Sequence, residues 1–123
     1  MNEQAHASAM QFAQQLIQLP SLSGQERAVV TACINQATRA GFDDATFDRM
    51  GNFIGRVQVG DGRGSKLLLT GHLDTVNADP VQWTPETRPY SGAMRDGKLF
   101  GRGASDMKAA VACMLQAAAS LKG

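Results

Sequence analysis

This sequence of 123 residues has no large excess of charge of one sign, few cysteines and no long apolar run. The 12 Lys and Arg nearly balance the 11 Asp and Glu, and a net charge of +1 excludes the strongly basic surface typical of nucleic-acid-binding proteins. No apolar stretch approaches the ~20 residues of a membrane-spanning helix, so we expect no membrane segment. Residues 1–20 lack a basic segment followed by an apolar core, and the cytoplasm is therefore the expected compartment.

Cysteine is too sparse for a disulfide framework. The two cysteines, Cys33 and Cys113, form no Cys-x-x-Cys pair, and each lies in a segment with helical periodicity. This arrangement argues against both a structural disulfide and a metal knuckle. We predict that both are reduced thiols in the core.

The amino-terminal third of the chain has the pattern of two helices. Apolar residues recur at three- and four-residue spacing over 8–19, and Pro20 cannot continue that helix. Ser23 and Glu26 have the spacing of a capping box, which predicts the start of a second helix. Gly41 predicts its end, because glycine adopts the left-handed conformation that commonly follows a helix.

The rest of the chain alternates between strand and helix patterns. An apolar period of two over 44–59 predicts a β-hairpin, and the glycine-rich 60–65 predicts an exposed turn. Residues 66–71 are apolar in succession, which is typical of a strand covered on both faces, here paired with the hairpin. A loop over 75–97 is too long for a passive connector. The segment 107–121 is apolar almost all round and predicts a helix covered on more than one side.

A histidine and an aspartate follow the predicted buried strand. His72 and Asp74 lie at its carboxyl end, where open α/β sheets place their ligand sites, and alternate residues of a strand share a face. A carboxylate bonded to one ring nitrogen fixes the tautomer and leaves the other nitrogen free for a metal. A structural pair that only stabilises a loop has the same short spacing, so both interpretations stay open.

A second candidate, Asp106, lies in GRGASDMK at 101–108, at the mouth of the predicted last helix. The glycines permit unusual backbone angles. Asp is also a favoured N-cap residue, and an ordinary cap explains Asp106 without a metal. Neither the phosphate-binding loop nor the dinucleotide fingerprint is present.

The two segments together are more specific than either alone. GHLDTV at 71–76 and DGKLFGRGASDMK at 96–108 resemble the amino-terminal half of the catalytic domain in the zinc aminoacylase and carboxypeptidase family. That family includes acetylornithine deacetylase, succinyl-diaminopimelate desuccinylase, aminoacylase and glutamate carboxypeptidase. The resemblance extends to the amino-terminal helices and the proline–serine turn between them, and so covers nearly all of the chain.

The resemblance implies roles for three residues. His72 is similar to the ligand of one metal, Asp106 to the carboxylate that bridges two zinc ions, and Asp74 to the catalytic residue that orients and polarises His72. Two zinc ions, or cobalt, would then hold a shared water and polarise the scissile amide carbonyl. The resemblance also implies a cis peptide bond between Asp106 and Met107, against the alternative of an ordinary trans N-cap.

Other residues of the same region are predicted to be structural. Trp83, Pro89 and Tyr90 are expected to pack the long loop rather than touch substrate. Arg102 is expected to make structural hydrogen bonds.

The resemblance implies an α/β fold in which residues 1–123 form the amino-terminal part of a metallohydrolase catalytic domain. We expect a partial three-layer α/β/α zinc-peptidase-like domain with the lid domain absent. The family completes its site with a Glu-Glu pair, a further acidic ligand and a distant His, none of which this sequence contains. About four ligands are needed for zinc, so we expect the chain to be inactive alone.

The expected function is hydrolysis of an amide bond in a small N-acyl amino acid or peptide. The alternative is a truncated, non-catalytic α/β module that binds metal weakly or not at all. We expect neither nucleic acid nor membrane as a partner. Uncovered apolar surface on the last helix and the central strand predicts self-association or pairing with the missing remainder of the domain.

Overall fold

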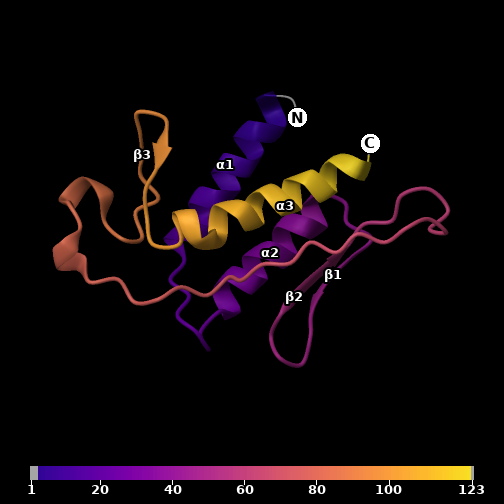
Figure 1. Ribbon diagram of the computed structural model, residues 1–123, viewed down its shortest axis with the longest axis horizontal. Helices are drawn as coiled ribbons and strands as arrows, with labels where there is room; N and C mark the ends of the chain where they lie inside the picture. Colours follow the sequence, from indigo (N-terminus) through magenta and orange to yellow (C-terminus); the bar gives the residue numbers. More distant parts are fainter. Residues whose placement is uncertain (1–2, 123) are drawn as a thin grey trace.

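A computed structural model describes residues 3–122 and shows three helices and two short hairpins (Figure 1). The helices are α1 (Glu3–Gln18), α2 (Arg27–Arg39) and α3 (Ala109–Ala119). The strands are β1 (Asp44–Phe47), β2 (Phe53–Arg56), β3 (Met94–Arg95) and β4 (Lys98–Leu99). Short helical turns cover Pro80–Gln82, Pro85–Thr87, Ala104–Lys108 and Ser120–Lys122. This mixture of helices and small strands is consistent with part of an α/β domain.

The core lies between the three helices. The apolar stripe predicted for the first helix is buried, with Phe12 and Leu16 at its centre, and α2 contributes Val29 and Cys33. The most extensive packing is between α1 and α3, which lie side by side (Figure 1). A cavity of about 10 Å³ remains among the helices. It is no larger than a single water molecule requires, so we do not consider it a ligand site.

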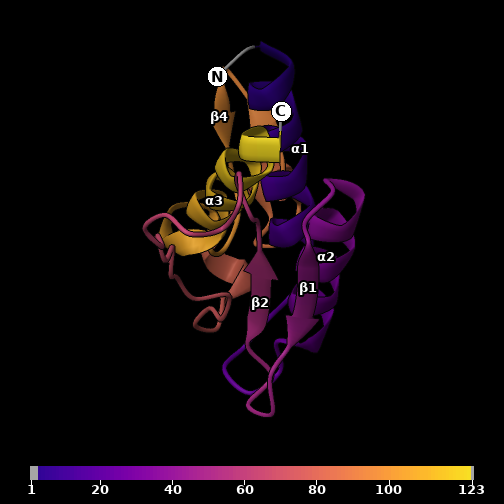
Figure 2. The same cartoon turned by 90° about the vertical axis from the view of Figure 1, so that its right-hand side faces the viewer.

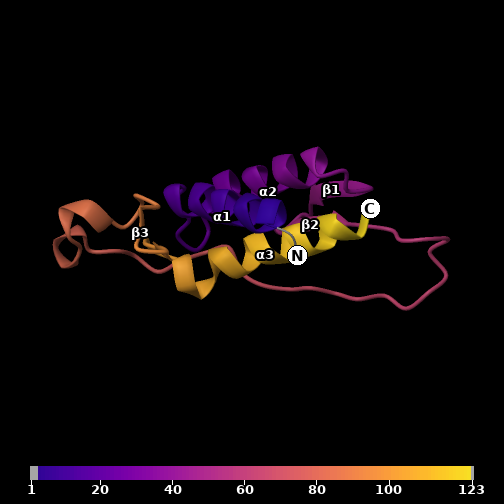
Figure 3. The same ribbon diagram turned by 90° about the horizontal axis from the view of Figure 1, so that it is seen from above.

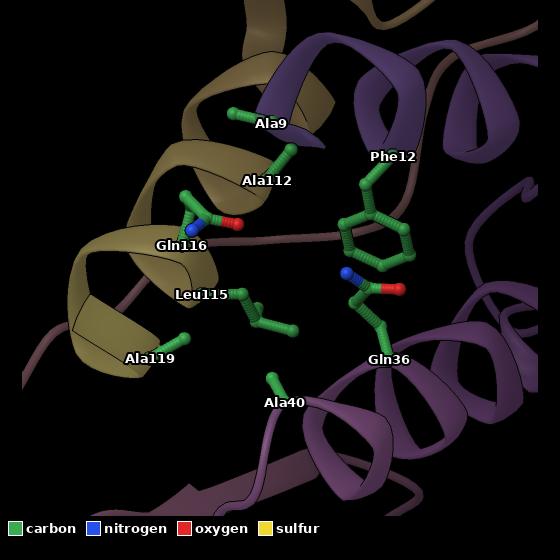
Figure 4. Close-up of a pocket in the computed structure, with 8 residues that line it drawn as sticks. All are labelled: Ala9, Phe12, Gln36, Ala40, Ala112, Leu115, Gln116 and Ala119. Atoms are coloured by element: carbon green, nitrogen blue, oxygen red, sulfur yellow. The ribbon is translucent and has the colours of Figure 1, made fainter. Parts of the chain in front are cut away.

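Figure 4 shows how this small cavity is enclosed. The ring of Phe12 from α1, the amide of Gln36 from α2 and the side chain of Leu115 from α3 converge on it. The cavity therefore marks the meeting point of the three helices.

The start of α2 differs from the prediction, whereas its end agrees with it. The Ser23 hydroxyl donates to the Asp74 carboxylate instead of accepting a helix amide, and the Glu26 carboxylate accepts the amide of Gly24. The predicted capping box is therefore wrong, because a charged carboxylate is the stronger partner for a hydroxyl. The carboxyl end follows the prediction, with Gly41 at φ +79° beyond the last turn.

The predicted hairpin is confirmed. Strands β1 and β2 pair antiparallel, with Asp44 opposite Arg56 and Phe47 opposite Phe53. The hairpin packs against α2, as Figure 2 shows. Residues 60–65 form the exposed turn that the glycines predicted.

The strand predicted at 66–71 is wrong in both pairing and burial. This segment is extended but joins neither sheet of the described residues, which are β1–β2 and β3–β4. Leu67 and Leu68 are 83% and 84% exposed. Figure 3 shows that the segment runs along the side of α3 that faces away from α1 and α2. Apolar residues in succession are buried only where elements are available to cover both faces, and among residues 3–122 only α3 lies beside this segment.

The last helix is covered on one side only. Val111, Ala112 and Leu115 face α1 and α2, whereas Cys113 and Ala117 are exposed. The predictions of a helix covered on several sides and of a core position for Cys113 are therefore wrong. Cys33 is a buried free thiol as predicted, and burial raises its pKa to about 12. Within residues 3–122, no helix is both long enough and apolar enough to cross a membrane.

One charged side chain lies inside the core. Lys108 is fully buried, and its ammonium donates to the carbonyl oxygens of Leu16 at 2.9 Å and Leu19 at 2.7 Å. These carbonyls belong to the carboxyl end of α1, where a cation is favoured by the helix dipole and α1 has no basic residue in its own last turn. Burial lowers the pKa of Lys108 to about 8, so the side chain is still an ammonium at neutral pH.

We predict that Lys108→Met lowers the free energy of unfolding by about 1–3 kcal/mol, because two buried carbonyls lose a charged donor. Urea denaturation measures the change. Lys98→Met is the matched control on the exposed β4, and its effect is expected to stay within about 0.5 kcal/mol. Equal stability of the two variants would contradict a structural role for the buried ammonium.

Candidate metal centre

The three predicted site residues meet at one place. The Nε2 atom of His72 lies 2.9 Å from Oδ1 of Asp106. The other ring nitrogen, Nδ1, lies 3.0 Å from the backbone oxygen of Asp74 and 3.2 Å from its Oδ1. The predicted convergence is confirmed, with one carboxylate on each side of the imidazole.

Backbone contacts with the turn after α1 hold the His72 segment in place. The amide of Thr75 donates to the carbonyl of Ser21 at 2.8 Å, and the Ser21 hydroxyl donates to the carbonyl of Leu73 at 2.7 Å. Leu22 and Thr75 form an isolated parallel bridge. Two loop segments, in which Ser21 and Leu73 lie 52 residues apart in the sequence, are thus fixed in register before any side chain of the site is considered.

A turn of irregular backbone places Asp106. Asp106 and Met107 have non-helical backbone angles, and the peptide bond between them is cis, as the resemblance implied. Regular helix begins behind the turn, at Ala109, and the side chain of Asp106 makes no capping hydrogen bond. The N-cap interpretation of Asp106 is therefore wrong, because its carboxylate is directed to His72 instead.

Two glycines make room for this turn. Gly103 has φ +82°, and its carbonyl accepts the amide of Lys108 at 2.8 Å. A Cβ at Gly71 would lie 2.6 Å from the Cε atom of Met107. The Sδ atom of the same Met107 accepts the amide of His72 at 3.4 Å. The backbone at Gly71 and His72 therefore packs against the side chain of Met107, and this contact joins the two halves of the site.

The carboxylates of the site stabilise the protonated, positively charged form of the His72 ring. The Asp106 carboxylate raises the pKa of His72 above its usual range, and the hydrogen bond to the backbone of Asp74 adds to this effect. The Ser23 hydroxyl, followed by smaller contributions from His72, lowers the pKa of Asp74. The side chain of Asp106 is 86% exposed, so its second oxygen faces solvent.

The residues predicted to be structural lie in the loop next to this turn. The guanidinium of Arg102 lies over the ring of Trp83, 5.8 Å from its centre. The amide of Arg102 donates to the carbonyl of Pro89 at 2.7 Å, and Pro89 is buried while Tyr90 is half-buried. These contacts join the loop to the Asp106 turn.

Sequence reasoning missed Ser23 as a member of the site. The hydroxyl of Ser23 lies 2.5 Å from Oδ2 of Asp74. Its spacing from Glu26 was interpreted as a helix cap, and nothing in the local sequence distinguishes that partner from a carboxylate 51 residues away.

Comparison with known proteins identifies a family and similar enzymes. Residues 68–123 match the family described as Peptidase family M20/M25/M40. The chain is 35% identical over 117 residues to a succinyl-diaminopimelate desuccinylase of Methylobacterium radiotolerans, and 36% identical over 118 residues to that of Methylorubrum extorquens. Each alignment covers 89% of this chain and 29% of the relative, so the chain spans under a third of the length of these relatives.

The chain belongs to the M20/M25/M40 peptidase family. Members of this family are generally metal-dependent, so the chemical type of the donor atoms matters. An imidazole nitrogen and a carboxylate oxygen that already face each other are donors suited to zinc. The carboxylate on Nδ1 supplies the outer support that a ligating histidine usually has. His72 and Asp106 are thus suitable in chemical type as two ligands of a metal.

This part of the M20/M25/M40 fold supplies two such donors and not a closed site. No group of three His, Cys, Asp or Glu side chains able to hold a metal occurs within residues 3–122. A catalytic zinc usually has three protein ligands. His72 and Asp106 are therefore at most part of a ligand set.

We predict that Asp106→Asn lowers the pKa of His72 toward 6.5 in the metal-free chain, because the main cause of the upward shift is removed. The pKa is raised in the folded state, so its stabilising effect is present below pH 6.5 and is lost as the pH rises through the folded pKa. NMR titration of the ring signals measures the shift. The ring signals of His6, on the exposed side of α1, provide an internal control in the same spectra. An unchanged His72 pKa would contradict this assignment.

Proposed function

We propose that this chain is the amino-terminal part of a metallohydrolase catalytic domain that cleaves the amide bond of a small N-acyl amino acid or peptide. The observation that carries the proposal is the imidazole of His72 between two carboxylates, with Asp106 at Nε2 and Asp74 at Nδ1. Membership of a peptidase family supports hydrolysis as the reaction. A three-layer α/β/α arrangement of the whole domain is part of the same proposal.

The roles of the three residues follow from their atoms. His72, with its proton on Nδ1, presents the lone pair of Nε2 to a metal, and Asp106 contributes a carboxylate oxygen beside it. Asp74 accepts the Nδ1 proton and so fixes the ring orientation and raises the basicity of the ligand. A bound zinc or cobalt ion lowers the pKa of its water and polarises an amide carbonyl.

The substrate class comes from the relatives. Both are named succinyl-diaminopimelate desuccinylase, so an N-succinyl amino acid is the first substrate to test. N-acetyl amino acids are the second, because both share the secondary amide on which such a site acts.

The number of donors argues that further ligands come from outside the described residues. Two donors hold a metal only weakly, and a pair of zinc ions needs more ligands than His72, Asp74 and Asp106 provide. We therefore propose that the chain alone binds metal weakly and is inactive as an amidase. Weak metal binding and inactivity are also expected of the alternative, a non-catalytic module. That module differs in having no partner that completes the site.

We predict weak but specific zinc binding by the isolated chain. His72→Ala and Asp106→Ala should each lower the zinc affinity at least about tenfold, because each removes a ligand. Isothermal titration calorimetry with zinc measures the affinities. His6→Ala is the matched control, since it removes the other histidine of the chain and should leave the affinity unchanged. Absence of zinc binding by the wild-type chain would contradict the proposed metal site, and hydrolysis of N-succinyl or N-acetyl amino acids by this chain alone would contradict its inactivity.

We also propose that the chain associates with itself or with a polypeptide that completes the domain. The extended segment 66–71 has free backbone groups, and Leu67 and Leu68 lie on it almost fully exposed. An unpaired extended segment with apolar side chains is a surface for strand pairing. The outer side of α3, with Cys113 and Ala117, adds apolar surface.

We predict that light scattering detects oligomers of the isolated chain. Leu68→Lys should shift the population toward monomer, because a charge on a pairing edge opposes association. Val81→Lys is the matched control, since Val81 is 89% exposed but lies in a helical turn of the long loop. A monomer at all concentrations would contradict self-association.

A further inference from the structure

One hydroxyl group contacts the site from a distant segment. The Oγ atom of Ser23 lies 2.5 Å from Oδ2 of Asp74, while Oδ1 of the same carboxylate lies 3.2 Å from Nδ1 of His72. The hydroxyl has no capping role, because α2 begins only at Arg27 and its N-cap has no side-chain hydrogen bond. The contact therefore belongs to the site rather than to the helix.

We propose that Ser23 is a positioning residue for the metal centre, which holds the Asp74 carboxylate so that it fixes the ring of His72. This inference rests on the proposed function, because it assigns Ser23 to the same metal site. The order of contacts is Ser23 to Asp74, Asp74 to His72 and His72 to Asp106.

The geometry explains why a donor is needed at this carboxylate. The Asp74 side chain is 38% exposed and would otherwise exchange hydrogen bonds with water. A short hydrogen bond from a hydroxyl to a charged carboxylate is stronger than one between two neutral groups. The backbone oxygen of Asp74 lies 3.0 Å from Nδ1, and Oδ1, whose partner oxygen Oδ2 is held by Ser23, lies 3.2 Å from the same nitrogen. Both oxygens favour a proton on Nδ1, which leaves Nε2 for a metal.

The hydroxyl can be removed without removing the local fold. The backbone register of the two segments depends on the contacts of Ser21 with Leu73 and Thr75, and none of these uses the Ser23 side chain. Ser23 is exposed, so its replacement leaves no cavity. A change at the His72 ring in a Ser23 variant would thus report on the hydroxyl itself.

The first test uses the metal-free chain and the ring nitrogens of His72. Long-range ¹⁵N–¹H NMR spectra, recorded where the ring is neutral, distinguish the Nδ1–H from the Nε2–H tautomer. We expect Ser23→Ala to change the Nδ1 shift of His72, because Oδ1 of Asp74 is then no longer held 3.2 Å from that nitrogen. Ser23→Thr, which retains a hydroxyl, should restore the wild-type shifts. Ser65→Ala, in the exposed turn, is the control for loss of a serine hydroxyl elsewhere.

The second test measures zinc affinity by calorimetry. Ser23→Ala should weaken zinc binding by about tenfold, at the lower end of the range for residues that support a metal ligand. In an Asp74→Asn background the same substitution should have no further effect, because Ser23 acts through that carboxylate. The isosteric pair Ser23→Thr and Ser23→Val repeats the comparison at constant shape, so the result does not depend on the folding of Ser23→Ala.

Each outcome decides the proposal. Unchanged tautomer shifts and unchanged zinc affinity in Ser23→Ala and Ser23→Val would overturn it, as would an equal loss in the Asp74→Asn background. If the wild-type chain binds no zinc, the proposed metal site fails, but the tautomer measurement still decides whether Ser23 positions the ring.

Discussion

The buried ammonium of Lys108 is the contact on which the arrangement of the site depends. It lies two residues after Asp106 and donates to the carbonyls of Leu16 and Leu19 at the end of α1. An ammonium inside a core is costly unless it is hydrogen-bonded, so the turn that precedes α3 has few alternative positions. The carboxyl end of α1 is stabilised by a cation, and the turn before α3 is fixed against the core. The position of Asp106 in that turn follows from this contact.

The site is built where three connecting segments meet, and each is anchored by hydrogen bonds to backbone carbonyls. The turn after α1 holds the His72 segment through Ser21 and Thr75, and the Asp106 turn is held by Lys108. Function-bearing loops on a rigid support are common, because the support restricts side chains that are themselves exposed. Here the exposed carboxylate of Asp106 lies two residues before a fully buried lysine that is bonded to the end of α1.

The sequence predicted those parts of the fold and site that depend on local pattern. The stripe of the first helix, the hairpin at 44–59 and the meeting of His72, Asp74 and Asp106 were all expected. The strand at 66–71 and the core position of Cys113 were not found, because an apolar residue is buried only if other elements cover it. Ser23 was misassigned for a related reason, since a hydroxyl can bond to any nearby donor or acceptor and not only to groups close to it in the sequence.

A proton and a metal ion compete for the same atom in this arrangement. With acceptors at both nitrogens, the metal-free imidazole is stabilised as the doubly protonated cation, and Asp106 is the main cause. A metal held at Nε2 would have to displace that proton, and metal affinity should therefore fall as the pH decreases through the raised pKa of His72. The carboxylate on Nδ1 supports the ring in both states, because Nδ1 keeps its proton in each. In the proposed site, Asp74, held in turn by Ser23, would keep its partner when a metal binds, whereas Asp106 would exchange a proton donor for the metal.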